Sequence, residues 1–313
     1  MNAVVMTAFG GPEVLRYGPW NKPTAAANHV VIKVHATSVN PIDWRIRKGE
    51  AKMWVRDRPP MILGADVAGE IAECGEGATR FPIGALVYAK LRGDVGGYQE
   101  YVSVPESAVA LRPSGLSAIE AAALPAGAMT ALQALRDVGE LKAGQSVLIN
   151  GASGGVGLFA VQIARVLGAH PTAVCSASAT DLVKRMGADD VIDYHSTDFT
   201  KLGRRWDVIF DVSATRSLAQ CRAALSPKGI YITTISGMGD MLMPLLNPIR
   251  SRKGRFVLVN ADGNDLDKVR ALVDEKKLVP VIDKVFPLAE AAAAQTYAEE
   301  NRPRGKVVLS VAA

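Results

Sequence analysis

The sequence predicts an α/β protein in which a β-rich N-terminal part is followed by a doubly wound parallel sheet. Two observations predict it. Roughly the first 115 residues hold short strand-like runs separated by glycine and proline. From Ser117 onward, strand-like and helix-like runs alternate, which is typical of a parallel sheet covered by helices on both faces. The length of 313 residues fits about two domains.

The N-terminal elements are expected to be strands. Residues 3–6, 30–34, 87–89 and 101–104 are rich in β-branched and apolar side chains, and Gly-Gly-Pro, Pro-Pro and Gly-Gly sequences lie between them. This spacing predicts an irregular β-barrel or sandwich.

The later elements alternate. An alanine-rich helix is expected over residues 118–135, with a kink or break at Pro125, because proline lacks the backbone donor that a helix interior needs. Strands are predicted at 147–150, 172–175, 191–192, 208–211, 230–233 and 256–259. Helices are predicted at 156–167, 180–186, 217–225 and 265–274. A last helix at 288–300 and a closing strand at 306–309 complete the pattern.

Composition narrows the class of protein. The net charge of +5 fits an anionic small-molecule partner and does not by itself indicate nucleic acid. The basic stretch 45–58 fits a solvated face.

Three cysteines without a C-x-x-C pair favour a reducing compartment, so we expect a cytoplasmic protein. The apolar run 121–135 is too short and too interrupted to span a bilayer. The first residues fit a strand better than a cleavable leader.

The strongest signal is the glycine-rich segment after the strand at 147–150. It reads Gly151, Ala152, Ser153, Gly154, Gly155, Val156 and Gly157, an A-x-G-x-x-G pattern that opens an amphipathic helix. Strand, glycine turn and helix in this order predict a dinucleotide site, with Gly154 letting the backbone approach a pyrophosphate and Gly157 letting the helix pack closely. The amides and dipole of the helix would hold the anion. The alternative is a tight turn without a ligand.

The end of the next strand favours NADPH over NADH. An acidic residue about 20 positions after the turn would bind the ribose 2′-hydroxyl of NAD. Here the strand ends in Ser176, Ala177 and Ser178, and no carboxylate follows until Asp181. The serine hydroxyls can accept a 2′-phosphate, and Lys184 or Arg185 could add positive charge.

Several motifs together resemble the medium-chain dehydrogenase/reductase superfamily, specifically its zinc-free quinone oxidoreductase branch. The resemblance covers nearly the whole chain. It rests on segments 36–44 (ATSVNPIDW), 63–69 (LGADVAG), 96–101 (GGYQEY), 124–131 (LPAGAMTA), 187–194 (GADDVIDY) and 304–309 (RGKVVL).

The resemblance implies a particular fold. A GroES-like β-barrel catalytic domain is expected from residues 1–123 together with 280–313, and a Rossmann dinucleotide-binding domain from residues 124–279. The family places its active site between such domains, and homodimers are common in it. We therefore expect a homodimer with no membrane span and no specific nucleic-acid partner.

The resemblance also suggests roles for individual residues. Asn40 would donate a hydrogen bond to the acceptor oxygen, and Asp43 would position a ribose hydroxyl or a neighbouring side chain; the alternative is that Asn-Pro-x-Asp is simply a turn. The expected pocket aromatics are Trp44, Trp54 and Tyr98, with barrel core as the alternative. Further cofactor contacts are expected at Thr130, Tyr194, Val212 and Arg304.

No metal is expected. Asn40 stands where zinc-dependent relatives carry a catalytic cysteine, Gly64-Ala65-Asp66 replaces their Gly-His-Glu, and the four histidines lack ligand spacing. Without zinc, reduction of a quinone or of an alkene conjugated to a carbonyl is easier than alcohol oxidation, because hydrogen bonds can stabilise the charge that develops on oxygen.

Alternatives to this activity remain. One is an enoyl-thioester reductase, and another is a nucleotide-binding relative that acts as an RNA-binding or structural protein. The methionine-rich stretch 236–254 suits a variable apolar ligand or a subunit interface.

Overall fold

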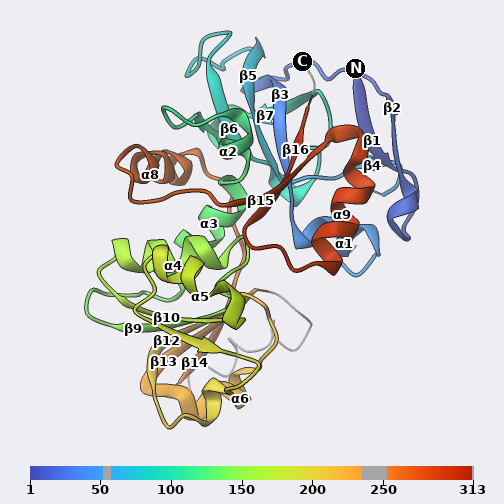
Figure 1. The fold of residues 1–313 in the computed structure, drawn as a ribbon. Helices are drawn as coiled ribbons and strands as arrows, with labels where there is room; N and C mark the ends of the chain where they lie inside the picture. The colour runs from blue at the N-terminus through green and yellow to red at the C-terminus, as the bar shows by residue number, and fades with distance from the viewer. Residues whose placement is uncertain (52–57, 235–251, 312–313) are drawn as a thin grey trace. The chain divides into compact units, whose positions relative to one another are not determined.

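The computed structural model describes residues 1–51, 58–234 and 252–311, which form two compact units (Figure 1). Unit 1 contains residues 1–126 and 260–313, and unit 2 contains residues 127–259. Two features singled out from the sequence, Trp54 and most of the methionine-rich stretch (residues 236–251), lie outside the described residues. Among those described, no helix combines the length and apolar character that a membrane span requires.

Unit 1 is built on two sheets, as the strand-like runs predicted. The larger has the strand order β15-β16-β3-β5-β6-β8, with β7 also paired to β3. Its strands are β3 (His29–Val39), β5 (Asp66–Cys74), β6 (Leu86–Lys90), β7 (Tyr101–Pro105), β8 (Val109–Leu111), β15 (Ile282–Pro287) and β16 (Lys306–Ser310). The smaller sheet has the order β2-β1-β4, with β1 (Asn2–Met6), β2 (Leu15–Pro19) and β4 (Met61–Ile62).

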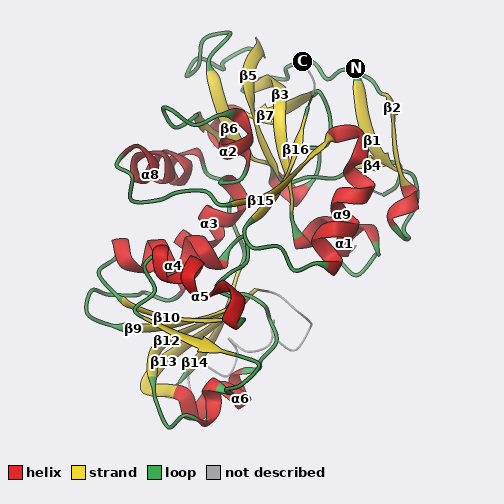
Figure 2. Cartoon of the chain, in the orientation of Figure 1, coloured by secondary structure: helices red, strands yellow, loops and turns green. Residues whose placement is uncertain are grey.

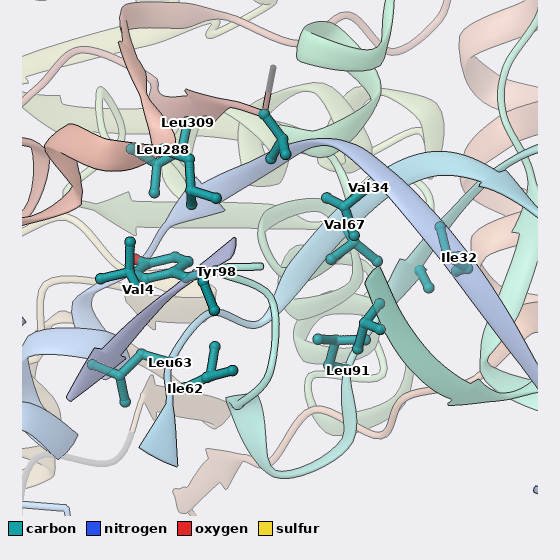
Figure 3. Close-up of a cluster of buried hydrophobic side chains, with 14 of the residues drawn as sticks. Val4, Ile32, Val34, Ile62, Leu63, Val67, Leu91, Tyr98, Leu288 and Leu309 are labelled. Atoms are coloured by element: carbon teal, nitrogen blue, oxygen red, sulfur yellow. The ribbon is translucent and has the colours of Figure 1, made fainter. Parts of the chain in front are cut away.

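The C-terminal strand closes unit 1 against the N-terminal sequence. Strand β16 pairs antiparallel with β3, so that Val307 lies opposite Val39 and Leu309 opposite Thr37. The apolar side chains of these strands enter one core with Val4, Tyr98 and residues of β5, as Figure 3 shows. Burying such β-branched and aromatic side chains is the main source of stability for this sheet.

Helices flank the sheets of unit 1 (Figure 2). They are α1 (Pro41–Arg47), α2 (Ala118–Ala122), α8 (Gly263–Asp274) and α9 (Ala291–Glu300), with α2 ended before Pro125 as expected. Residues 260–279, which include α8, belong to unit 1 rather than to unit 2, so the second boundary between the units follows residue 259 and not residue 279 as predicted. The phenol of Tyr88 donates to the Leu266 carbonyl at 2.6 Å, and a Cβ on Gly263 would lie 2.5 Å from the Val109 carbonyl, so α8 packs directly on β6 and β8.

Unit 2 has the predicted doubly wound parallel sheet. The strand order is β11-β10-β9-β12-β13-β14, and every neighbouring pair is parallel. The strands are β9 (Ser146–Asn150), β10 (His170–Cys175), β11 (Asp190–Asp193), β12 (Trp206–Asp211), β13 (Leu225–Thr234) and β14 (Lys253–Val257). The helices include α3 (Pro125–Gln133), α4 (Gly157–Val166), α5 (Thr180–Arg185) and α6 (Leu218–Cys221). Strand β14 begins three residues earlier than predicted, because pairing of Lys253 with Ile230 extends it over a polar segment with little β propensity.

Candidate active site

The glycine turn of unit 2 joins β9 to α4, as predicted. Gly151 has φ of +85°, a conformation that favours glycine. A Cβ on Gly157 would lie 2.2 Å from the Gly151 carbonyl oxygen, so only glycine lets α4 begin this close to the turn. A Cβ on Gly154 would meet only that same carbonyl, at 3.6 Å, so the space beside Gly154 is open. A dinucleotide pyrophosphate fits such a turn, since its oxygens need close approach to backbone amides.

Strand order places this turn at the point where the sheet reverses its winding. Strand β9 has β10 on one side and β12 on the other, and ligands of doubly wound sheets bind at the carboxyl ends of strands at such points. The Asn150 side-chain amide donates to Asp211 at 2.8 Å, and the Val212 backbone N–H donates to the Asn150 carbonyl at 3.0 Å. These bonds tie the ends of β9 and β12 together. The prediction that Val212 contacts the cofactor stays a prediction. The bond between Asn150 and Asp211 was not predicted, although a polar residue ends each strand.

The end of β10 presents hydroxyl groups. Ser176 is half-buried and Ser178 is exposed, and their side-chain oxygens lie 3.1 Å apart. No carboxylate follows them before Asp181. Tyr194 follows β11, is 44% exposed, and stacks on His195 with ring centroids 4.3 Å apart. Two neighbouring hydroxyls can donate to a phosphate oxygen, so this edge fits a 2′-phosphorylated ribose.

Unit 1 holds a buried polar cluster at the start of α1. The Asn40 side-chain amide donates to Asp66 Oδ2 at 2.8 Å, and Lys306 Nζ donates to Asn40 Oδ1 at 2.5 Å. Ser38 Oγ also donates to Asp66, and the Ala126 N–H donates to its other oxygen at 2.6 Å. All four side chains are at most 7% exposed. We call this set of side chains the ammonium cluster: Ser38, Asn40, Asp66 and Lys306.

Asp43 adjoins this cluster and has unusual chemistry. Its carboxylate accepts the Asn40 backbone N–H at 2.8 Å and the Tyr98 hydroxyl at 2.7 Å, while Oδ1 is buried with no partner among the described residues. Burial raises the pKa of Asp43 from 3.8 to about 7, although the bonds from Tyr98 and Asn40 oppose the shift. Burial, and then the charge of Asp43, raise the pKa of Tyr98 well above its usual value.

The remaining predicted residues occupy different places. Trp44 is partly buried against the core of unit 1, and Tyr98 is completely buried in it. Thr130 is buried in α3 within unit 2. Arg304 lies in unit 1, where its backbone N–H donates to Asp283 at 2.9 Å. Trp54 lies outside the described residues.

The structure also brings together residues that sequence reasoning did not assign to a site. Ser38 and Asp66 lie within motifs that were recognised, but Lys306 is 266 positions from Asn40 and no spacing signals its contact. In the described ranges, no three His, Cys, Asp or Glu side chains lie close enough together to ligate a metal ion.

Comparison with known proteins adds independent evidence. A family model described as "Alcohol dehydrogenase GroES-like domain" matches residues 26–114, and one described as "Zinc-binding dehydrogenase" matches residues 186–309. The chain is 34% identical over 322 residues to "Chloroplast envelope quinone oxidoreductase homolog" of Arabidopsis thaliana, covering 99% of this chain and 98% of the relative.

Two further relatives agree with this. The chain is 32% identical over 322 residues to "NADPH-dependent alkenal/one oxidoreductase, chloroplastic" of Arabidopsis thaliana, covering 99% of this chain and 79% of the relative. The solved quinone oxidoreductase of Coxiella burnetii superposes with a TM-score of 0.92 at 30% identity, covering 100% of this chain and 99% of that one.

Proposed function

The chain belongs to the quinone oxidoreductase branch of the medium-chain dehydrogenase/reductase superfamily, and from this premise we propose that it is an NADPH-dependent, zinc-independent reductase of quinones or α,β-unsaturated carbonyl compounds. The observation that carries the proposal is the glycine turn at the end of β9, where Gly157 permits the close start of α4 and Gly154 leaves its flank open. The names of the two plant relatives support the two classes of acceptor.

Each unit contributes chemistry that this activity needs. In unit 2, the backbone of residues 151–157 binds the pyrophosphate, while Ser176 and Ser178 bind the 2′-phosphate of the ribose. The bound nicotinamide supplies the hydride. In unit 1, the ammonium cluster supplies polar groups in a water-poor setting, where hydrogen bonds to a developing negative charge are strongest. The predicted roles of Thr130, Tyr194, Val212 and Arg304 in cofactor binding belong to this proposal.

We also propose that the protein prefers NADPH to NADH. The paired hydroxyls at the end of β10, without a carboxylate beside them, support it because a carboxylate would repel the 2′-phosphate. A fluorescence titration measures it directly: NADPH is expected to bind at least tenfold more tightly than NADH, and equal affinities would contradict the preference. The Ser176→Ala/Ser178→Ala double variant is expected to reduce that ratio.

Activity is tested by initial rates of NADPH oxidation. The protein, treated with a chelator, is given an ortho-quinone and, in parallel, a 2-alkenone. Turnover of either acceptor supports the proposal, and the ratio of the two rates identifies the preferred class. Binding of NADPH without reduction of either acceptor would contradict it and favour an enoyl-thioester reductase or a nucleotide-binding protein without this activity.

We also propose a homodimer and a cytoplasmic location. Cys74, Cys175 and Cys221 form no disulfide in the described part of the chain, which suits a reducing compartment. Light scattering across micromolar concentrations checks the assembly, and a monomer throughout would contradict the dimer. Cell fractionation checks the location.

A further inference from the structure

Lys306 places a positive charge in the interior of unit 1 without using all of its hydrogen-bond donors. Its side chain is 4% exposed, and Nζ lies 2.5 Å from Asn40 Oδ1 and 3.4 Å from Asp66 Oδ2. An ammonium group has three N–H donors. No residue in the described part of the chain accepts the third. This third N–H is therefore available to an oxygen of a bound molecule.

The chemistry of its neighbours fixes how Asn40 is oriented. The Lys306 ammonium can only donate, so the side-chain oxygen of Asn40 must face Lys306. The Asp66 carboxylate can only accept, so the side-chain nitrogen of Asn40 must face Asp66. The second amide hydrogen has only Ser38 oxygens near it, at 3.4 and 3.5 Å. The Asn40 amide therefore serves the cluster itself, and the strong donor that remains is the Lys306 ammonium.

Asp66 neutralises Lys306 and is itself saturated. Its two oxygens accept from Ser38, Asn40, the Ala126 N–H and Lys306. A carboxylate with this many donors is held in one orientation, so it fixes the position of the ammonium. The result is a preorganised cation, which is the arrangement that stabilises developing negative charge most effectively.

We propose that Lys306 is a catalytic residue that donates its third N–H to the carbonyl oxygen of the acceptor; this rests on the proposed function. When the hydride forms a C–H bond at the β-carbon of an enone, the C=C electron pair moves toward oxygen and produces an enolate. The ammonium stabilises that oxyanion. A proton taken up from the solvent then bonds to the α-carbon of the enolate and gives the saturated ketone; the hydride donor would be left as NADP⁺.

The two classes of acceptor provide the first test. An ortho-quinone becomes aromatic on reduction and needs little help, whereas an enone depends on stabilisation of its oxyanion. Lys306→Met is expected to lower kcat/KM for a 2-alkenone by about 100-fold or more and for an ortho-quinone by less than about tenfold, the scale measured for loss of one oxyanion donor. Equal losses for both acceptors would overturn the proposal and leave Lys306 a structural role.

Two variants control for damage to the fold. Lys306→Met leaves Asp66 buried without its cation, so Lys306→Met/Asp66→Asn removes both charges and is expected to show the same loss selective for the enone. Lys90 is the matched control: it is also 4% exposed in unit 1, but its ammonium donates to Asp94 at 2.6 Å and to the Leu91 carbonyl at 3.3 Å, and to no member of the ammonium cluster. Lys90→Met is expected to leave the ratio of the two kcat/KM values within about threefold of wild type. A selective enone loss in Lys90→Met as large as in Lys306→Met would overturn the assignment.

A binding measurement tests Lys306 without turnover. 4-Nitrophenol is an oxyanion probe whose absorbance distinguishes phenol from phenolate. The wild-type chain is expected to bind the phenolate at a pH where the free compound is protonated, and Lys306→Met is expected to lose this signal. The same signal in both proteins would overturn the proposal. A wild-type protein that binds phenolate through Lys306 but reduces neither acceptor would support the oxyanion site and reject the proposed function. If neither binding nor reduction occurs, both are rejected.

Discussion

At the residue scale, the unpartnered oxygen of Asp43 shows how burial changes a carboxyl group. Oδ2 accepts two hydrogen bonds and Oδ1 accepts none among the described residues, so hydrogen bonds stabilise the buried carboxylate on one oxygen only. The pKa of about 7 means that Asp43 changes charge near neutral pH, next to Lys306 and Asp66. Because Asp43 adjoins the ammonium cluster, its titration near neutral pH is expected to make the activity depend on pH.

Asp43 is also expected to make stability depend on pH. Between pH 4 and 7 the unfolded carboxyl ionises while the folded one, with its pKa raised from 3.8 to about 7, keeps its proton. Folding is therefore favoured fully below pH 4 and loses about 1.4 kcal/mol per pH unit up to pH 7, where the loss levels off. Asp43→Asn keeps the shape and removes the titration. Urea unfolding at several pH values is expected to show Asp43→Asn gaining stability over wild type as the pH rises. A difference that is constant with pH would contradict this.

At the scale of elements, two glycines of the same turn are expected to differ: Gly157 is needed for folding, whereas Gly154 is needed only for binding the cofactor. Gly157→Ala is expected to lower both the melting temperature and the affinity for NADPH, because its Cβ would press on the Gly151 carbonyl. Gly154→Ala has room in the folded chain, so it is expected to melt like wild type but to bind NADPH at least tenfold more weakly, since the methyl group occupies the space of the pyrophosphate. Thermal melts and fluorescence titrations measure the two effects. Normal NADPH binding by Gly154→Ala would show that the cofactor lies elsewhere.

Helices α1 and α9 come from opposite ends of the chain and are joined by one buried cation. Arg47 is completely buried and donates to Gln295 at 2.7 Å, to the Gly10 carbonyl at 2.9 Å and to Glu299 at 3.1 Å. Lys48 pairs with the same Glu299, but its side chain is 40% exposed.

This contrast gives a stability prediction. Arg47→Met is expected to lower the free energy of unfolding by about 3 kcal/mol, because several buried acceptors lose their donor. Lys48→Met is expected to cost less than about 1 kcal/mol, as exposed ion pairs usually do. Chemical denaturation of both variants provides the comparison. Equal, small losses would mean that Arg47 does not hold the two helices together.

At the scale of the whole molecule, the sequence predicts elements better than it predicts which elements meet. The alternating sheet of unit 2 was predictable because each strand and helix has its own local pattern of apolar residues. Helix α8 was also predicted, but its amphipathic pattern does not say on which sheet it packs, and it joins unit 1. The glycine turn was predictable because the strand, the turn and the start of the helix are encoded in adjacent residues. The ammonium cluster was not, because Lys306 reaches Asn40 only after β16 pairs with β3.

Zinc-independent hydride transfer is tested most directly by following the hydrogen that is transferred. NADPH deuterated at both C4 positions of the nicotinamide is given to chelator-treated protein with a 2-alkenone, and the saturated ketone is analysed by mass spectrometry. Zinc-independent hydride transfer is expected to place one deuterium on the β-carbon, at a rate that added zinc does not change. A ketone without deuterium, or label transfer that begins only when zinc is restored, would contradict a zinc-independent hydride transfer.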